Sequence, residues 1–284
     1  MPAYDTLLCD VQDGIATLTL NRPTALNAVS PRMADELVDL LGRLSADETL
    51  RVLVLRGAGD NFCAGGDVRE MAARTGQDAP AAAQALHRMA RYRRLTLALH
   101  RFDRPVIAAV DGVAFGAGMS LALLSDLVLL SDRARLCMAF QRVGLVPDCG
   151  ALYMLPRLVG LQQAKALALS AREIGAAEAL ALGLAIAVLP PERLHAKARQ
   201  LAEAIACGSS TALSLTKRAL DASLQSDLET MLALEATSQA AALTSAEHRE
   251  AVDRFARKEP ARCRWPELPD DRPPPGQGRA SGEG

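Results

Sequence analysis

Two short apolar segments constrain the fold more than any other feature of this 284-residue chain. The segment RVLVLRG at residues 51–57 has little polar alternation, and PVIAAV at residues 105–110 is of the same kind. A strand with apolar residues on both faces is typical of a parallel sheet that is covered on both sides. The two segments therefore predict a parallel sheet buried between layers of helices.

Strands and helices alternate along the first two thirds of the chain. GIATLTL (14–20) has the alternation of a half-buried strand. SPRMADELVDLLGRL (30–44) has helical spacing, with Ser30 as N-cap and Pro31 at the first helical position. A helix is expected over 116–125 and strands over 126–131, 135–138 and 185–189. This alternation predicts an α/β protein built from right-handed crossover units.

The composition changes near residue 191, where strand signals end. Alanine-rich amphipathic segments then fill 191–207, 209–224, 226–243 and 245–257. We therefore expect a core over residues 1–195 and a helical region over 196–258. The remaining residues, 259–284, are rich in proline, glycine and charge, which predicts a disordered tail.

The charge balance and the cysteines limit the class of protein. With 32 basic and 33 acidic residues, the net charge of −1 gives no long-range attraction to nucleic acid or to membranes. The six cysteines are far apart and form no CxxC pair, so reduced thiols are expected. The first residues are acidic where a secretory signal needs a basic region, and residues 112–125, the longest uncharged apolar run, are too few to span a membrane. We expect a cytoplasmic protein without a bound metal, because the four histidines lack ligand-like spacing.

A glycine-rich turn follows each of the two apolar strands. These turns are NFCAGGDVREM (61–71) and GVAFGAGMSLAL (112–123). Small residues let a ligand approach the backbone, and a helix that starts at such a turn offers unpaired N–H groups. Two neighbouring turns could aim two amides at one oxygen, as an oxyanion hole does. For each turn alone, tight packing between a strand and a helix is the favoured explanation.

The second turn differs from two common glycine motifs. GAGMS lacks the serine between glycines that a G-x-S-x-G nucleophile elbow requires. The G-x-G-x-x-G spacing of a dinucleotide-binding turn is also absent. A hydrolase of that type and a dehydrogenase therefore lose support.

Four motifs in order resemble the enoyl-CoA hydratase/isomerase (crotonase) superfamily over about residues 5–258. They are ATLTLNRPTALNAVS (16–30), RVLVLRGAGDNFCAGGDV (51–68), RPVIAAVDGVAFGAGMSLALLSDLVLLSDRARL (104–136) and MAFQRVGLVPDCGALYMLPRLVG (138–160). The resemblance implies a ClpP-like spiral of ββα units, with a C-terminal helical region that builds a homotrimer or a hexamer. It also implies acyl-CoA thioester substrates and no separate cofactor, because coenzyme A is part of the substrate.

The resemblance assigns the oxyanion hole to the backbone N–H groups of Gly66 and Ala117. Proton removal next to a thioester carbonyl yields an enolate, and each well-placed donor at its oxygen contributes roughly 10²–10³ in rate. The resemblance also assigns substrate contact to Ala25, Leu26, Ala64, Gly65, Asp67, Val68, Gly116, Phe140 and Lys258. For Asp67 a turn acceptor or N-cap is the favoured alternative, and for Lys258 it is a solvated helix face.

Hydratases of the family use two glutamates to position and activate water, and this chain has neither. The first glutamate falls at Ser120 and the second at Phe140. Serine and phenylalanine cannot replace a pair of general acid/base groups, so water addition is not expected as the main activity.

One carboxylate remains, Asp148 in the segment PDCG. It matches the acidic residue of family branches that move double bonds or rearrange ring-derived acyl-CoAs, and its segment is most similar to that of 1,2-epoxyphenylacetyl-CoA isomerases. Isomerisation takes a proton from C2 and returns it elsewhere, so one carboxylate can do both. The alternative is that Asp148 is a helix N-cap, and both roles can coexist.

The neighbours of Asp148 carry further expectations. Burial among Phe140, Leu145, Val146 and Leu152 is expected to raise its pKa. The family usually has glycine and then threonine or serine where this chain has Ala151 and Leu152, so the acyl pocket is expected to differ in shape. Cys149 is expected to be a small packing residue, since no histidine is nearby in sequence to activate it.

These observations predict an acyl-CoA isomerase in which Asp148 moves the proton. Two substrates fit: 2-(1,2-epoxy-1,2-dihydrophenyl)acetyl-CoA and a 3-enoyl-CoA. Two alternatives stay open, a hydrolase or dehalogenase with Asp148 as nucleophile and an acyl-CoA-binding protein without activity.

Overall fold

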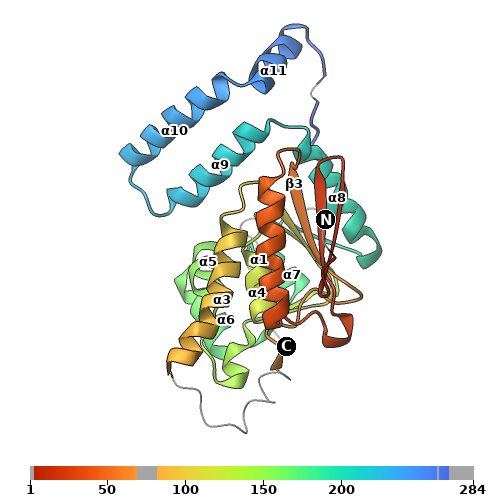
Figure 1. The fold of residues 1–284 in the computed structure, drawn as a ribbon, viewed down its shortest axis with the longest axis vertical. Coiled ribbons are helices and arrows are strands. Elements are labelled where there is room, and N and C mark those ends of the chain that lie inside the picture. The colour runs from red at the N-terminus through yellow and green to blue at the C-terminus, as the bar shows by residue number, and fades with distance from the viewer. Residues whose placement is uncertain (1–2, 69–81, 261, 269–284) are drawn as a thin grey trace, which may run out of the picture.

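The computed structural model describes residues 3–68, 82–260 and 262–268 (Figure 1). Its main sheet has six strands in the spatial order β1-β2-β3-β4-β6-β9. They are β1 (Leu7–Gln12), β2 (Ile15–Leu20), β3 (Val52–Gly57), β4 (Val106–Val110), β6 (Leu127–Ser131) and β9 (Ala187–Leu189). Strand β1 pairs antiparallel with β2, and the other neighbours pair in parallel. The predicted α/β class is confirmed.

Helices cover both faces of this sheet. These helices are α1 (Pro31–Ala46), α3 (Ala82–His100) and α8 (Pro191–Ala206). Leu53 and Leu55 of β3 belong to the larger core, which includes residues of α1, whereas Val52 and Val54 belong to a second core with α8. The absence of polar alternation in β3 is therefore explained, because alternate side chains enter two different apolar layers.

Helix α1 begins where the sequence predicts. The Ser30 hydroxyl accepts a hydrogen bond from Met33 N over 3.1 Å, and Pro31 occupies the first turn. The buried face of α1 is formed by Met33, Ala34, Leu37, Leu40, Leu41 and Leu44, which recur at helical spacing.

A second sheet has three strands, and the chain passes repeatedly from the main sheet to this one, which gives it a spiral path. It has the order β5-β7-β8, with β5 (Val113–Phe115), β7 (Arg135–Cys137) and β8 (Glu173–Gly175). Strand β4 of the main sheet leads to β5 and then to α4 (Ala117–Leu123), and β6 leads to β7 in the same way. The remaining short elements are η1 (Pro23–Ala25), η2 (Ala139–Val143), α5 (Ala151–Val159), α6 (Leu161–Ser170) and α7 (Ala176–Ala181).

Three C-terminal helices form an arm that extends from the body (Figure 1). They are α9 (Ser210–Ser223), α10 (Leu228–Leu243) and α11 (Ala246–Ala256), and none of their residues is buried. Helix α8, in contrast, packs on the sheet through Leu194, Ala198 and Leu201. The boundary expected after residue 195 therefore falls inside a helix of the core, and the arm starts after α8.

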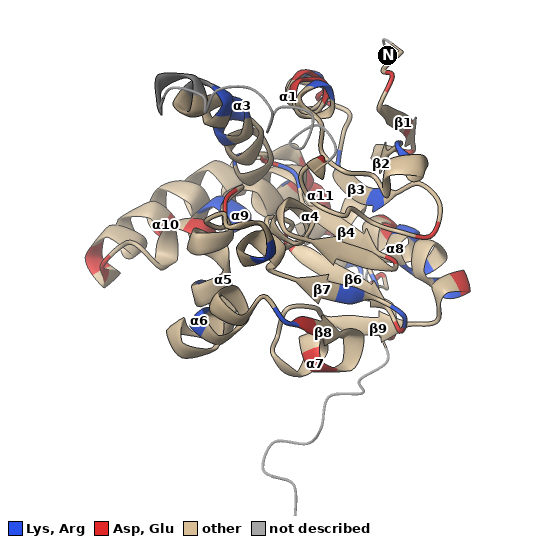
Figure 2. Cartoon of the chain, turned by 90° about the horizontal axis from the view of Figure 1, so that it is seen from below, with Lys and Arg blue, Asp and Glu red and all other residues tan. Residues whose placement is uncertain are grey.

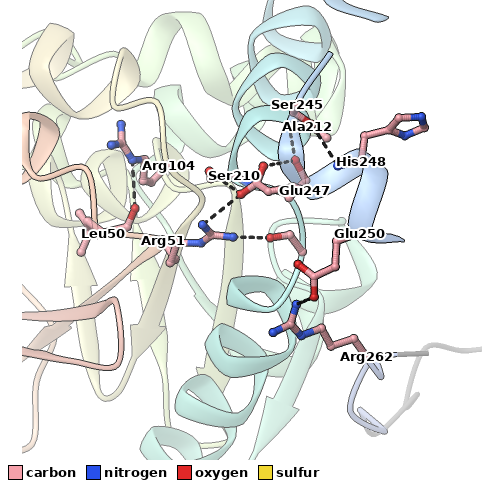
Figure 3. Close-up of polar contacts among 12 residues, drawn as sticks. Leu50, Arg51, Arg104, Ser210, Ala212, Ser245, Glu247, His248, Glu250 and Arg262 are labelled. Atoms are coloured by element: carbon pink, nitrogen blue, oxygen red, sulfur yellow. Dashed lines mark hydrogen bonds and ion pairs between the residues drawn. The ribbon is translucent and has the colours of Figure 1, made fainter. Parts of the chain in front are cut away.

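Polar contacts anchor the arm to the amino end of β3 (Figure 3). Arg51 pairs with Glu247 over 3.2 Å and donates to Gly208 O over 2.5 Å. Glu247 also accepts from the hydroxyls of Ser209 and Ser210, over 2.6 and 3.1 Å. One carboxylate of α11 thus joins the start of α9 to the body.

Two cysteines differ from expectation. Cys207 and Cys263 form a disulfide, with their Cα atoms 5.6 Å apart, so the prediction of six reduced thiols is wrong for this pair. The bond closes because the chain after α11 returns to the end of α8. Residues 262–268, expected in the disordered tail, then lie along α8: Lys197 Nζ donates to Glu267 O over 3.2 Å, and Leu268 packs against the second core. Residues 269–284 of that tail lie outside the described residues.

Figure 2 shows Lys and Arg interspersed with Asp and Glu over the elements of the body. Within the described ranges, no helix has both the length and the apolarity needed to cross a lipid bilayer.

Candidate active site

The loop that follows β3 is held by backbone hydrogen bonds on two sides. Cys63 N donates to Val113 O, and Cys63 O accepts from Phe115 N, both over 2.9 Å. On the other side Val29 N donates to Gly65 O over 2.7 Å. The loop therefore lies between the segment before α1 and the second sheet, and these contacts fix the directions of its peptide groups.

The second glycine-rich turn joins β5 to α4 and touches the first loop. Gly116 has a φ of +49°, and its N–H donates to Cys137 O over 2.8 Å. Gly65 has a φ of +100°, and a Cβ on it would lie 2.8 Å from Phe115 O and 3.5 Å from Ala117 N. A side chain at 65 would therefore push the two turns apart, so glycine permits their contact.

Two main-chain amides at these turns have no hydrogen-bond acceptor among the described residues. They belong to Gly66, which follows the close approach, and to Ala117, the first residue of α4. Unpaired N–H groups in adjoining turns are the donors that an oxyanion hole requires. The structure thus brings together the two glycine-rich turns in which the sequence predicts the amides of the oxyanion hole.

Asp148 lies in a turn immediately before α5. Its carbonyl accepts from the Ser120 hydroxyl over 3.1 Å and from Ala151 N over 3.0 Å. The N-cap of α5 is Gly150, and no side chain caps this helix. The alternative that Asp148 is the N-cap is therefore wrong.

The carboxylate of Asp148 is partly buried, and its Oδ1 atom has no hydrogen-bond partner within the described part of the chain. Burial raises the pKa of Asp148 above its ordinary value of 3.8, and a hydrogen bond with the Cys149 thiol opposes this rise. An acid in such surroundings is a stronger base than a solvated one.

Three of the four residues expected to bury Asp148 are exposed, and only Phe140 is buried. Leu145, Val146 and Leu152 are 44%, 70% and 59% exposed. Instead the turn packs against α3 and the C-terminal end of α4. A Cβ on Gly150 would lie 3.1 Å from Thr96 Cγ2 and 3.2 Å from Leu124 Cδ2. Ala151, the other departure from the family pattern, is buried in the core.

The two positions of the missing glutamates lie at the centre of this arrangement. Ser120 is completely buried, and its hydroxyl also lies 3.1 Å from Gly116 O. The Phe140 ring lies against the same turn, with its Cζ atom 3.8 Å from the place of a Cβ on Gly116. Both positions are therefore occupied by packed side chains that cannot activate water.

Asp67 has a structural partner that the sequence pattern does not mark. Its carboxylate pairs with Arg22 over 2.8 Å, and Arg22 also donates to Ala28 O over 2.6 Å. This pair ties the loop after β3 to the segment before α1. Arg22 lies inside the motif ATLTLNRPTALNAVS, but nothing in that motif indicates its pairing with Asp67.

The other residues assigned to substrate contact divide into two groups. Leu26 and Ala64 lie together, since Ala64 N donates to Leu26 O over 2.9 Å, and Ala25 directly precedes Leu26. Leu26 and Val68 are exposed apolar side chains at the edge of these loops.

Lys258 is not part of this group. It follows α11, which is anchored at the amino end of β3, whereas the glycine-rich loop follows the carboxyl end of that strand. Three further cations of the C-terminal helical region have acidic partners: Lys217 pairs with Asp126, and Arg254 and Arg257 pair with Glu259.

Cys149 is a packing residue, as expected. It is 5% exposed, and burial together with the charge of Asp148 raises the pKa of its thiol, which disfavours a nucleophilic thiolate. Among the described residues, no three His, Cys, Asp or Glu side chains are grouped so that they could hold a metal ion.

Comparison with known proteins identifies the family. The enoyl-CoA hydratase/isomerase family model matches residues 10–265. The chain belongs to the enoyl-CoA hydratase/isomerase family. A 1,2-epoxyphenylacetyl-CoA isomerase of Escherichia coli is 38% identical over 252 residues, which cover 89% of this chain and 95% of that protein.

Members with different activities are similar to this chain. A short-chain-enoyl-CoA hydratase of Clostridium acetobutylicum is 31% identical, with 89% of this chain and 95% of that protein covered. A crystal structure of an enoyl-CoA hydratase/isomerase from Cupriavidus metallidurans has a TM-score of 0.87 and 42% identity, and covers 95% of this chain and all of that one. The crotonase spiral with its C-terminal helical region is confirmed.

Proposed function

We propose that this family member is an acyl-CoA isomerase that works through a thioester enolate. One observation carries the proposal: the turn of Asp148, with its unpartnered and partly buried carboxylate oxygen, is joined through Ser120 to the turn that presents the Ala117 amide. The Ser120 hydroxyl thereby links the turn of the proposed base to the turn of one proposed oxyanion donor.

The reaction needs two proton transfers, one from C2 of the acyl group and one to another of its carbons. The Asp148 carboxylate takes a proton from C2 of the acyl group, and the electron pair of that C–H bond moves to form the enolate, with the negative charge on the thioester oxygen. The Gly66 and Ala117 amides donate to this oxygen. The protonated Asp148, which can exchange its proton with solvent, then donates a proton to another carbon of the acyl group, and the thioester carbonyl is restored.

The environment of Asp148 suits both steps. A pKa raised by burial makes the carboxylate a better base, and it still lets the acid form donate the proton back. Water addition would need a second acid/base group, and the two positions where the family's hydratases carry glutamate hold Ser120 and Phe140.

Two substrate classes fit this chemistry, 2-(1,2-epoxy-1,2-dihydrophenyl)acetyl-CoA and a 3-enoyl-CoA. The relative from Escherichia coli supports the first class by its name. Exposed apolar side chains near the glycine loop and the Asp148 turn, those of Leu26, Val68, Val146 and Leu152, give an acyl group surface to contact. We place the reaction in the cytoplasm, without a cofactor beyond the coenzyme A of the substrate.

We further propose that the arm joins copies of the chain into a homotrimer or a hexamer. Helices α9 and α10 form a groove of about 760 Å³, lined mainly by apolar residues, yet bury none of their own residues. Leu220, Leu228 and Leu232 are 66%, 75% and 53% exposed. An exposed apolar surface of this kind is typical of a protein–protein interface. The family resemblance supports a second copy of this chain as the partner.

Proton exchange at C2 tests the catalytic proposal. Phenylacetyl-CoA incubated in D₂O with the native protein should gain deuterium at C2, because enolate formation and reprotonation exchange that hydrogen. Asp148→Asn should lower the exchange rate by at least about 10³-fold, since the amide cannot accept the proton. Binding of the thioester, measured by calorimetry, should change less than about threefold.

Asp13→Asn is the matched control for this substitution. Asp13 lies in the turn between β1 and β2, at the end of the sheet away from the site, and its φ of +53° is one that asparagine tolerates. Exchange in this variant should equal that of the native protein. Undiminished exchange in Asp148→Asn, or a covalent acyl-enzyme trapped on Asp148 in mass spectrometry, would overturn the proposal.

A further inference from the structure

The Ser120 hydroxyl contacts both halves of the proposed site. Its Oγ atom lies 3.1 Å from Gly116 O and 3.1 Å from Asp148 O, and the residue is completely buried. The Gly116 carbonyl belongs to the same peptide group as the Ala117 N–H. One hydroxyl thus lies between the peptide that presents the oxyanion donor and the peptide that carries the proton-moving acid.

The turn that holds Asp148 needs such support. Cys149 has a φ of +50° and Gly150 one of +83°, so two successive residues are left-handed. A non-glycine residue in this region costs about 1–2 kcal/mol and keeps its conformation only where surrounding contacts fix it. The Asp148 carbonyl, held by Ser120 from one side and by Ala151 N from the other, provides that fixation.

Helix α4 supplies a second contact from the same face. Leu124 lies one helical turn after Ser120, and its Cδ2 atom is 3.2 Å from the place of a Cβ on Gly150. The turn at 148–150 is therefore seated on α4 at two points, one polar and one apolar. Because α4 begins at Ala117, movement of the turn along α4 changes the position of the carboxylate relative to the oxyanion donor.

We propose that Ser120 is a positioning residue for catalysis. Its hydroxyl fixes the Gly116–Ala117 peptide and the Asp148 turn relative to each other, so that the amide and the carboxylate act on the same thioester. The inference rests on the proposed isomerase function and adds to it: the side chain at the first glutamate position of the hydratases serves here to hold the acid used instead. The hydroxyl has a single proton, so the Gly116 and Asp148 carbonyls share it in a three-centre hydrogen bond.

A purely structural role for Ser120 makes a different prediction. Serine in a helix commonly donates to the carbonyl four residues earlier, as Ser120 does to Gly116. Ser125 makes the same kind of bond to Leu121 O over 3.4 Å just after α4, and it is 7% exposed. Ser125→Ala is therefore the matched control, because it removes an equivalent hydroxyl whose described hydrogen bond goes to Leu121 O and not to the Asp148 turn.

The test compares Ser120→Ala with Ser125→Ala in the full chain. The Ser120 variant should fold, since Gly116 O still accepts from Ser120 N and Asp148 O still accepts from Ala151 N. Its kcat for isomerisation, or its rate of C2 exchange, should fall about 10- to 100-fold, as expected for a misplacement near 1 Å. KM should stay within about twofold, and the melting temperature should match that of Ser125→Ala within about 3 °C.

The outcomes separate this inference from the function on which it rests. A kcat of Ser120→Ala equal to that of Ser125→Ala, together with an inactive Asp148→Asn, would overturn the positioning role and leave the isomerase proposal standing. A loss confined to KM would also overturn it. Full exchange in Asp148→Asn would overturn both, whatever Ser120→Ala does.

Discussion

Gly65 shows how a single missing side chain creates the proposed oxyanion hole. Its φ of +100° is unfavourable for other residues, and the space beside it is already filled by Phe115 O. The backbone of the loop after β3 can therefore contact the turn before α4, and both unpaired amides lie at this contact.

Gly65→Ala should reduce activity strongly. The new Cβ must move away from Phe115 O, which separates the Gly66 and Ala117 amides, so kcat should fall on the order of 10²-fold. Gly59→Ala is the control: its φ of +69° carries a similar conformational cost, but its Cβ meets only Pro23 Cβ, at 3.6 Å. Gly59→Ala should lose about 1–2 kcal/mol in chemical unfolding and Gly65→Ala more, because of its clash, and only Gly65→Ala should lose activity. Equal activity of the two variants would contradict this account of the loop.

The sequence predicts the glycine turns better than it predicts the surroundings of Asp148. Gly65 and Gly116 stand out because their backbone geometry requires glycine, which is a local property. The exposure of Leu145 and Leu152 is set by how the turn before α5 is seated on other helices, and no local pattern encodes that. Ser120 is recognisable from the sequence only as an absent glutamate, while its link to Asp148 requires the fold.

At the scale of elements, an apolar run is what makes a strand predictable from the sequence. The apolar runs that became β3, β4 and β6 are long enough to show their character. Strands β5 and β8 have three residues each and are not predicted, although β7 and β9 are equally short and are predicted, so the sequence does not predict the second sheet as a sheet. The same shortness lets β5 deliver the chain directly into the turn at Gly116.

The attachment of α11 to the body should depend on pH. Although its burial raises the pKa of Glu247, hydrogen bonds from Ser209 and Ser210 and the charge of Arg51 lower it to about 2. A carboxyl with a depressed pKa stabilises the fold above its unfolded value of 4.5, and this contribution is lost as the pH falls toward 2.

Glu247→Gln should therefore lower stability at neutral pH and not in acid. Since the side chain is partly solvated, the loss in unfolding free energy at pH 7 should be about 1 kcal/mol. Thermal melts at pH 7 and near pH 2.5 measure the difference, which should nearly vanish at the lower pH. Glu48→Gln, at an exposed glutamate for which no ion pair is described, should leave both melts unchanged. A deficit of the same size at both pH values would argue against an ionic anchor.

At the scale of the whole molecule, the body and the arm differ in how far their apolar residues are buried. The body buries its apolar residues on both faces of one sheet, whereas the arm leaves large leucines in solvent. This contrast is the reason for proposing an assembly through the arm.

Leu232→Glu should dissociate that assembly. The new charge lies in the groove between α9 and α10, so an interface built there should weaken by several kcal/mol. Light scattering after gel filtration should give a trimer or hexamer for the native chain and a monomer for the variant. Leu169→Glu, at a 71% exposed leucine of α6, should keep the native mass. A native chain that elutes as a monomer at micromolar concentration would refute the assembly.

The bond between Cys207 and Cys263 makes the arm a closed ring of polypeptide. A protease that nicks the connection between α9 and α10 would cut the chain without releasing either fragment, because both remain tied at the end of α8. Releasing α10 and α11 then takes two separate chemical events, peptide hydrolysis and disulfide reduction, and neither alone suffices.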